Sequence, residues 1–153
     1  MNIVDGEEYT KEITELIVEY NQALGRDLSF QGFDDELSDL TVKYSFPEGR
    51  LLCAITDEGE VIGCVAYHRH DDSRCEMKRL FVKPEHRKLH AGRKLIEAIV
   101  EAARKDGYNE MVLDTITPLQ SAIHLYKKYG FEECEPYYNN PMDDVVYMRK
   151  KLK

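Results

Sequence analysis

The chain has 153 residues, of which 42% are hydrophobic and 33% charged, and its formal net charge at pH 7 is −8. This length suits one buried core, so we expect a single domain over residues 1–153. No apolar run approaches the ~20 residues that a membrane span needs, and the N-terminus lacks the basic and apolar segments of a secretory signal. These features argue against a membrane partner and predict a cytoplasmic protein.

The first half of the chain predicts two helices followed by three strands. Apolar residues from Ile13 to Leu24 recur at helical spacing and Gly25 follows as a stop, which predicts the first helix. Residues 33–40 predict a second, shorter helix. Apolar runs separated by turn residues then predict a hairpin and a further strand that Pro84 ends. The three predicted strands cover residues 51–56, 61–70 and 73–82.

The second half of the chain alternates helices and strands. Residues 91–107 have a strong helical pattern that ends at Gly107. A strand over residues 110–115 precedes a helix over residues 117–130. We expect that helix to begin with a capping box, made by Thr117, Pro118 and Gln120. The closing strands are predicted at residues 131–135 and 144–152.

The cysteines do not indicate a metal site or a disulfide framework. The chain contains no CxxC pair among Cys53, Cys64, Cys75 and Cys134. Without an export signal, a chain of this size is expected to keep its cysteines reduced and mostly packed. His68, His70 and Cys75 could be assembled into a metal-binding set, but their spacing is not that of structural zinc ligands. We therefore expect no metal.

Positive charge gathers between Lys78 and Lys94, although the chain as a whole is acidic. This window has one acidic residue, Glu85, and seven basic ones: Lys78, Arg79, Lys83, Arg87, Lys88, Arg93 and Lys94. A basic patch on an acidic protein suits a compact polyanionic ligand better than a nucleic acid, which needs a broad positive face. We expect no nucleic-acid partner. A solvated charged face is the alternative that charge alone leaves open.

The stretch HRKLHAGRKL, residues 86–95, reads as a phosphate-binding loop that opens a helix. Unpaired backbone N–H groups and the helix dipole attract phosphate at such a place. The chain contains neither GxGxxG nor GxxxxGK[ST], so the common nucleotide-binding fingerprints do not apply. The loop therefore predicts a site for a different ligand that carries a pyrophosphate.

Three stretches carry a resemblance to a known family: EMKRLFVKPEHRKLHAGRKLIEAIVEAARKDGY, MVLDT and AIHLYKKYGF, in this order. Over nearly its whole length the chain resembles the GCN5-related N-acetyltransferase (GNAT) superfamily, in particular its small bacterial-type single-domain members. The resemblance implies an α/β fold with a mixed, centrally splayed β-sheet flanked by helices on both faces. It also implies an enzyme that moves acetyl from acetyl-CoA to an amine by direct attack.

The family's pyrophosphate motif maps onto six consecutive residues: Arg87, Lys88, Leu89, His90, Ala91 and Gly92. The ends of the motif match, and its middle glycine is His90 in this chain. A histidine that keeps a negative φ would still donate its N–H to phosphate, and Arg93 flanks the start of the helix. We expect a working loop in which the His90 imidazole lies against the pyrophosphate. An imidazole that points into solvent is the alternative.

The resemblance also assigns roles around the strand that precedes this loop. It places cofactor contacts at Leu80, Phe81 and Val82. It makes Tyr126, a further cofactor contact, the acid that protonates the departing thiolate, and Glu76 the general base. Strand alternation predicts one shared face for Glu76, Lys78, Leu80 and Val82. The alternatives are a Tyr126 that serves only the core or its rim, and a Glu76 that forms an ordinary ion pair.

The sequence does not identify the acceptor, which we expect to be a small-molecule or peptide amine. Tyr137, Tyr138 and Asn140 could line its pocket, or the aromatic residues could simply cover the core. The acidic body weakly favours a cationic acceptor such as a polyamine, an aminoglycoside or a lysine side chain. The sequence leaves open whether the protein forms a homodimer. A CoA-binding regulatory or interaction module with weak catalysis is the second interpretation, for which His90 is the first sign.

Overall fold

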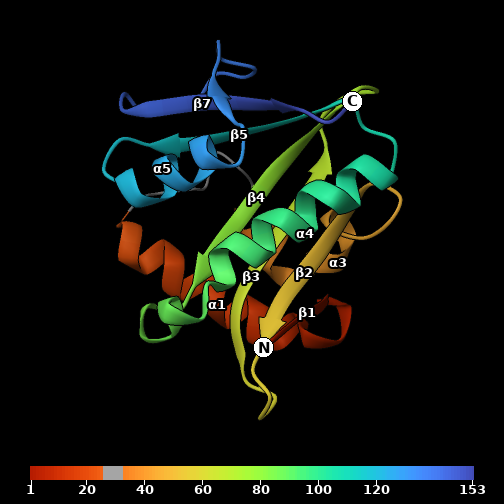
Figure 1. The fold of residues 1–153 in the computed structure, drawn as a ribbon, viewed down its shortest axis with the longest axis vertical. Helices are drawn as coiled ribbons and strands as arrows, with labels where there is room; N and C mark the ends of the chain where they lie inside the picture. Colours follow the sequence, from red (N-terminus) through yellow and green to blue (C-terminus); the bar gives the residue numbers. More distant parts are fainter. Residues whose placement is uncertain (26–32) are drawn as a thin grey trace.

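The computed structural model describes residues 1–25 and 33–153, and the side chains of these residues except Arg87 and Lys88. Within them the chain forms a seven-stranded sheet with the spatial order β1-β2-β3-β4-β5-β7-β6 (Figure 1). The strands are β1 (Asn2–Asp5), β2 (Gly49–Ile55), β3 (Val61–Arg69), β4 (Arg74–Val82), β5 (Glu110–Ile116), β6 (Glu132–Glu133) and β7 (Val145–Lys151). The α-helices are α1 (Thr10–Leu24), α2 (Phe33–Ser38), α3 (Leu40–Lys43), α4 (Ala91–Lys105) and α5 (Gln120–Lys128). Short 3₁₀ helices are η1 (Glu7–Tyr9) and η3 (Pro84–Leu89).

Helices cover both faces of the sheet (Figure 1). On one face, α4 packs through residues such as Leu95 and Ile99 against the central strands, and α5 joins this core through Tyr126. On the other face, α1 packs through Ile13 and Leu16, together with α2 and α3. The predicted α/β fold with helices on both faces of the sheet is confirmed.

The sheet is mixed, because β4 and β5 run parallel while its other strand pairs run antiparallel. The parallel ladder is short and extends only from Arg74 opposite Glu110 to Glu76 opposite Val112. Beyond these positions the two strands diverge toward their carboxyl ends (Figure 1). The predicted central splay is confirmed. It leaves the edge of β4 after Glu76 without backbone pairing to β5.

A β-bulge interrupts β4 within the splayed region. Arg79 has a φ of +62°, and the two residues Arg79 and Leu80 lie opposite the single residue Val65 of β3. An extra residue on one strand shifts the alternation of every side chain that follows it. Residues before and after the bulge therefore do not follow one continuous alternation.

The bulge corrects the predicted face of β4. Leu80 and Val82 pack toward the core beneath α4. Glu76 lies opposite His68, and both face the α1 side of the sheet, where Phe81 also packs. The predicted shared face for Glu76, Lys78, Leu80 and Val82 is therefore wrong, because Glu76 and Lys78 precede the extra residue and the other two follow it.

The start of α5 also differs from its prediction. The helix begins at Gln120, and its N-cap is Leu119, which makes no side-chain capping bond. Gln120 Nε2 donates instead to the carbonyl of Thr117, and the Leu119 N–H donates to the Ile116 carbonyl at 3.0 Å. The predicted capping box of Thr117, Pro118 and Gln120 is wrong, because the chain makes a turn before the helix begins.

Three further findings concern the cysteines, groups that could hold a metal, and helices that could span a membrane. Cys53, Cys64 and Cys75 are buried free thiols, as their predicted packing role requires. Among the described residues, no group of three His, Cys, Asp or Glu side chains is placed to hold a metal ion. No helix in residues 1–25 and 33–153 is long and apolar enough to cross a membrane.

Candidate active site

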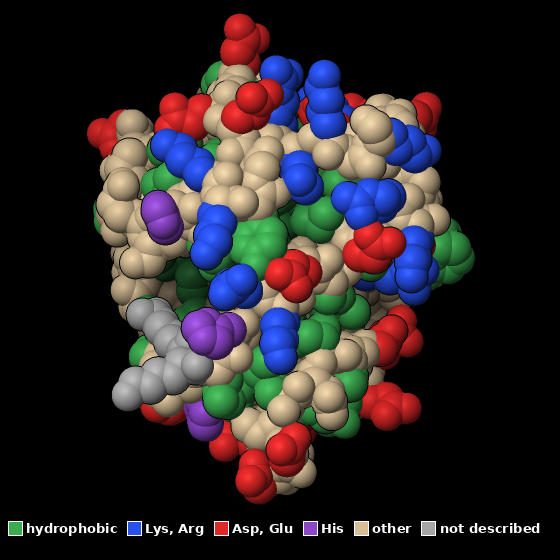
Figure 2. Space-filling model, in the orientation of Figure 1, with side chains coloured by type: hydrophobic (Ala, Val, Ile, Leu, Met, Phe, Trp, Pro, Cys, Tyr) green, Lys and Arg blue, Asp and Glu red, His purple; other side chains and the backbone are tan. Residues whose placement is uncertain are grey.

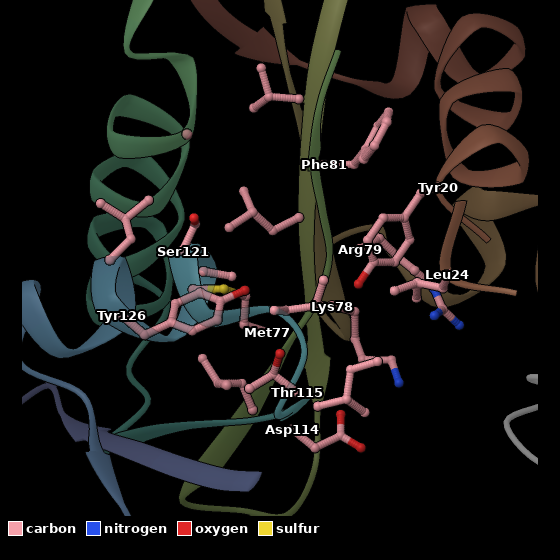
Figure 3. A pocket seen from close by; sticks show the side chains of 18 of the residues that line it. Tyr20, Leu24, Met77, Lys78, Arg79, Phe81, Asp114, Thr115, Ser121 and Tyr126 are labelled. Carbon is pink, nitrogen blue, oxygen red and sulfur yellow. The ribbon is translucent and has the colours of Figure 1, made fainter. Parts of the chain in front are cut away.

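A cavity of about 650 Å³ lies between the diverging carboxyl ends of β4 and β5. The β4 strand divides it into two parts, which we name by the helices beside them (Figure 3). The α5 half lies toward α4 and α5 and is lined by Met77, Leu80, Val82, Gly92, Arg93, Leu113, Ser121 and Tyr126. The α1 half lies toward α1 and is lined by Tyr20, Leu24, Lys78, Arg79, Phe81, Asp114, Asn140 and Met142.

The α5 half offers backbone groups and positive charge. The β4 edge at Leu80, Phe81 and Val82 lines the cavity, and no ladder to β5 occupies it. The start of α4 lies beside this edge, with Gly92 and Arg93 in the lining. On this face of the molecule, Figure 2 shows Lys and Arg side chains around a hollow with hydrophobic side chains inside it. Such a half can bind an extended ligand through its backbone and hold an anion at the helix start.

His90 is the N-cap of α4 and lies in the left-handed region, with φ +58° and ψ +30°. The negative φ considered for it is wrong, because the backbone keeps the conformation that glycine adopts most easily. Its exposed side chain lines the cavity. The Lys94 N–H donates to the His90 carbonyl at 3.2 Å. The first N–H groups of an α-helix have no acceptor within the helix, so the start of α4 suits an anion.

The basic window is divided in space. Lys78 and Arg79 are each 8% exposed and belong to the α1 half, so they are not part of a patch at the start of α4. The expected single basic patch is wrong for these two residues, because strand geometry turns them inward. Arg93 lies at the rim, where its Nε donates to the Tyr129 hydroxyl at 3.1 Å.

The other motif residues have different surroundings. Ala91 is fully buried in the core beneath α4, whereas Leu89 is exposed. The side chains of Arg87 and Lys88, predicted to bind the cofactor, lie outside the described part of the structure; their backbone belongs to η3. Of the six motif residues, His90 and Gly92 are found in the cavity lining.

Tyr126 lines the α5 half from α5, and its side chain reaches into the cavity in Figure 3. It is 8% exposed, and its ring packs edge-on against Phe131 at a centroid distance of 5.9 Å. Burial, with smaller effects from Tyr20 and Asp114, raises the pKa of the Tyr126 phenol. The hydroxyl therefore stays protonated at neutral pH and can donate to a group in the cavity.

Glu76 lies behind the α1 half and is not one of the described residues in the cavity lining. It is 6% exposed, its Oε1 lies 2.8 Å from His68 Nε2, and its Oε2 accepts from the Tyr137 hydroxyl at 2.5 Å. Burial raises its pKa, but the His68 contact, the Lys78 charge and the Tyr137 hydroxyl outweigh burial and lower it from 4.5 to about 2. Both carboxylate oxygens are therefore engaged.

Asp114 is the carboxylate that does line the cavity. It stands near the carboxyl end of β5, and in Figure 3 its oxygens lie on the same side of β4 as Lys78. Its Oδ2 accepts from the Tyr138 hydroxyl and from Asn140 Nδ2, the latter at 2.9 Å. Of the three predicted acceptor-pocket residues, Asn140 lines the cavity, whereas Tyr137 and Tyr138 lie behind it and each holds one carboxylate.

The wall of the α1 half is held by a buried ion pair. Arg79 Nε and Nη2 donate to the two carboxylate oxygens of Glu36 at 2.7 and 3.0 Å. The Arg79 guanidinium also lies over the Phe33 ring, 5.2 Å from its centroid. This pair ties α2 to the bulge of β4 and compensates the charge of Arg79 inside the protein.

Sequence reasoning missed most of the α1 half. Tyr20 and Leu24 gave no functional signal, because their spacing is that of the apolar side of a helix. Asp114 did give a signal, because it is an acidic residue directly after the buried apolar run of residues 111–113, in the stretch MVLDT near the end of β5. Polar residues at the carboxyl ends of adjacent parallel strands often bind ligands, so this position could have been named.

Comparison with known proteins agrees with the architecture. A sequence model described as the acetyltransferase (GNAT) family matches residues 11–131. An uncharacterized N-acetyltransferase of Schizosaccharomyces pombe is 47% identical to the chain, over 90% of this chain and 85% of the relative.

Solved structures share the fold. A GNAT family acetyltransferase from Staphylococcus aureus superposes with a TM-score of 0.83 at 23% identity, over 99% of both chains. A GNAT family acetyltransferase from Elizabethkingia anophelis, solved with acetyl-CoA bound, has a TM-score of 0.58 at 22% identity, over 68% of this chain and 76% of that one.

Proposed function

Because the chain belongs to the GNAT family of acetyltransferases, we propose that it transfers an acetyl group from acetyl-CoA to a primary amine by direct attack. The observation that carries this proposal is a single cavity with residues from both sides of β4. A donor in the α5 half and an acceptor in the α1 half would meet at the splay, so no acyl-enzyme is needed.

The α5 half fits acetyl-CoA in three respects. The free backbone edge at Leu80, Phe81 and Val82 suits the amide groups of the pantetheine arm. The start of α4, with His90, Gly92 and Arg93, suits the pyrophosphate. Arg87 and Lys88 belong to the same proposal through the sequence motif. The E. anophelis neighbour, solved with acetyl-CoA bound, supports this choice of donor.

When bound, acetyl-CoA supplies the thioester whose carbonyl carbon the amine attacks. A backbone N–H of the splayed β4 edge would stabilise the negative charge that develops on the carbonyl oxygen. Tyr126, protonated and directed into the cavity, would donate to the departing sulfur and supply its proton. Glu76, the base that the sequence resemblance implies, stays a prediction.

The acceptor is a primary amine that enters the α1 half. The N-acetyltransferase name of the S. pombe relative supports an amine acceptor. Apolar walls from Leu24 and Met142 suit the carbon body of the acceptor, and Asn140 offers a hydrogen-bonding amide. Tyr137 and Tyr138 act behind the wall, where they orient Glu76 and Asp114.

The proposal is tested by thiol release from acetyl-CoA with a panel of amines. The panel contains phenethylamine, spermidine, kanamycin and a lysine-containing peptide, and mass spectrometry identifies any acetylated product. We expect amine-dependent thiol release and an N-acetyl product with at least one of them. CoA binding by calorimetry without turnover of any amine would overturn the proposal in favour of a regulatory CoA-binding module.

A further inference from the structure

We propose that Asp114, rather than Glu76, binds the acceptor's amine and accepts its proton. This inference rests on the proposed acetyl transfer and names a catalytic residue that the sequence motifs did not include. Four observations support it: the place of Asp114 along the splay, its supporting hydrogen bonds, its available oxygen and the charges around it.

The place of each carboxylate follows from strand register. Glu76 pairs with Val112 at the last position where β4 and β5 are hydrogen-bonded, which is the closed end of the splay. Asp114 is two residues further along β5 on the same face as Val112, so it lies roughly 7 Å nearer the open end. Lys78 occupies the matching step on β4. The cavity lining accordingly includes Asp114 and Lys78 but, among the described residues, not Glu76.

The supporting hydrogen bonds fix one oxygen of Asp114. Oδ2 accepts from both Tyr138 and Asn140, and Asn140 Nδ2 also donates to the Tyr138 hydroxyl at 2.8 Å. The Tyr147 hydroxyl donates to the Tyr138 carbonyl at 3.1 Å, and the Asn140 N–H donates to the Tyr147 hydroxyl at 3.3 Å. The loop that holds Asp114 is thereby attached to β7, which positions the carboxylate without a lysine or arginine in these contacts.

The second oxygen of Asp114 is the one that can meet a substrate. No hydrogen bond from the described residues reaches Oδ1, whereas both oxygens of Glu76 are engaged. A carboxylate with one anchored oxygen and one directed to a cavity can bind an ammonium group and orient it. Burial raises the pKa of Glu76, but the His68 contact, the Lys78 charge and the Tyr137 hydroxyl outweigh burial and lower it to about 2, which makes Glu76 a weak proton acceptor.

Titratable groups from several elements around the cavity interact with the Asp114 carboxylate, and Lys78 is the charged one among them. The Asp114 carboxylate affects the pKa values of Tyr20 on α1, Lys78 on β4, Tyr126 on α5, and Tyr137 and Tyr138 in the loop before β7. The set spans both halves of the cavity and includes the proposed acid, Tyr126. Asp114 therefore lies in the electrostatic field of the reacting centre, where an incoming ammonium would interact with it.

The proton transfers balance as follows. The acceptor arrives as an ammonium ion and gives one proton to Asp114, which becomes a neutral acid and later releases that proton to water. The free nitrogen lone pair forms the C–N bond to the thioester carbonyl carbon, and the C–S bond breaks with its electron pair on sulfur. The sulfur takes a proton from Tyr126, and the second proton lost by nitrogen replaces that one on the phenol through solvent.

The test compares Asp114→Asn with the wild type, using phenethylamine, whose apolar body suits the α1 half, or the panel amine with the highest turnover. We expect kcat/KM for the amine at pH 7 to fall about 100-fold or more, because only the free amine can then react. In the variant, kcat/KM should rise about tenfold per pH unit toward the amine's own pKa, which is ~10.4 for a lysine side chain, whereas the wild-type profile should rise less steeply. Acetyl-CoA affinity should stay unchanged, and Asp114→Glu should restore part of the activity.

Two controls separate this role from a structural one. Asp143→Asn makes the same charge change on an exposed residue outside the cavity lining and should behave as the wild type. If Asp114→Asn fails to fold, Tyr138→Phe removes one anchor of the carboxylate and should lower kcat/KM for the amine without changing acetyl-CoA affinity.

The outcomes distinguish the two proposals. Wild-type turnover together with an Asp114→Asn variant that keeps the wild-type pH profile, or with a Tyr138→Phe variant that keeps the wild-type kcat/KM for the amine, would overturn the role of Asp114 alone. The same steepened profile in Glu76→Gln, and not in Asp114→Asn, would assign the base to Glu76. Absence of wild-type turnover with every amine of the panel would overturn both the proposed function and this inference.

Discussion

The two halves of the cavity differ in how the chain builds them. The α5 half comes largely from one continuous stretch, the end of β4 through the start of α4, with α5 added later in the chain. The α1 half is assembled from side chains far apart in sequence, such as Tyr20, Lys78, Asp114 and Asn140. A site made from local backbone can be anticipated from a motif, whereas a site made from distant side chains depends on the completed fold.

The difference also separates two kinds of specificity. The α5 half offers mainly backbone N–H and C=O groups and a helix start, which suit one constant ligand. The α1 half offers a carboxylate, an amide and apolar side chains, so under the proposed function we expect substitutions there to change which amine is accepted. Variants in the two halves should therefore have separable effects on donor and acceptor.

Among the variants of Tyr126, Glu76, Gly92 and His90, loss of the Tyr126 hydroxyl should have the largest effect, and it should affect turnover rather than binding. In Tyr126→Phe we expect kcat to fall about 100-fold, because the phenol acts on a sulfur that becomes a leaving group only during reaction. Acetyl-CoA affinity, measured by calorimetry, should stay within about twofold. Tyr9→Phe, which removes a phenol outside the cavity lining, is the matched control. An unchanged kcat in Tyr126→Phe would exclude the acid role.

Glu76 should matter for stability in a pH-dependent way. Its pKa is lowered from 4.5 to about 2 in the folded protein, so its stabilisation is fully present above pH 4.5 and is lost as pH falls toward 2. Glu76→Gln mimics the protonated acid and should lower the free energy of unfolding by ~3 kcal/mol at pH 7. Urea unfolding of both proteins between pH 3 and pH 7 measures the difference.

The control for this series is Glu58→Gln, an exposed residue in the turn between β2 and β3, which should have little effect. A destabilisation by Glu76→Gln that stays constant from pH 7 to pH 3 would contradict the linkage. It would show that the loss comes from packing rather than from the charge of the carboxylate.

Substitution of Gly92 should weaken binding of the donor, acetyl-CoA, without affecting the acceptor. A Cβ at this position would contact Leu125 Cδ2 at 3.6 Å and Val82 Cγ2 at 3.9 Å, which are ordinary packing distances. Gly92→Ala should therefore fold with undiminished stability, since alanine also favours the helix. The methyl group would keep the pyrophosphate from the backbone, so we expect the Kd of CoA to rise about tenfold. Unchanged CoA affinity, with unchanged melting temperature, would place the pyrophosphate elsewhere.

Substitution of His90 should have the smallest effect, and it should act through the left-handed backbone conformation on the free energy of unfolding. A non-glycine residue in the left-handed region costs about 1–2 kcal/mol, part of which glycine loses again through the flexibility of the unfolded chain. His90→Gly should therefore raise the free energy of unfolding by up to about 1 kcal/mol. His86→Gly, at a position without positive φ, should lower it. Urea denaturation measures the free energy of unfolding of both variants. An equal decrease in His90→Gly and His86→Gly would contradict this expectation and show that His90 makes contacts that compensate its backbone cost.

Much of the fold could be predicted because its periodic segments are long. The pattern from Ile13 to Leu24 and the stop at Gly25 both reappear in α1, whose C-cap glycine has a φ of +63°. The hairpin of β2 and β3 and the helix α4 are also present. The strand β1 and the helix α3 were not predicted, because each has four residues and presents no periodic pattern.

The errors concern places where tertiary packing overrides local pattern. Alternation along β4 fails at Arg79, where a bulge lies opposite β3 and the side chain pairs with Glu36, and neither partner is visible in the pattern of β4 itself. Thr117 and Gln120 match the sequence pattern of a capping box, yet the chain makes a turn between them, and α5 begins only at Gln120. Asp114 was overlooked, although its place near the end of a mostly apolar strand was a usable signal, because a strand pattern does not reveal the splay that brings it to the cavity lining.

The most direct test of a shared cavity with two halves is the initial-rate pattern of the wild-type enzyme with acetyl-CoA and the best amine of the panel. Direct attack requires both substrates to be bound together, so double-reciprocal plots at several fixed amine concentrations should intersect. Intact-protein mass spectrometry after incubation with acetyl-CoA alone should show no acetylated protein. Parallel lines together with a covalent acetyl adduct would contradict a donor and an acceptor that meet across β4.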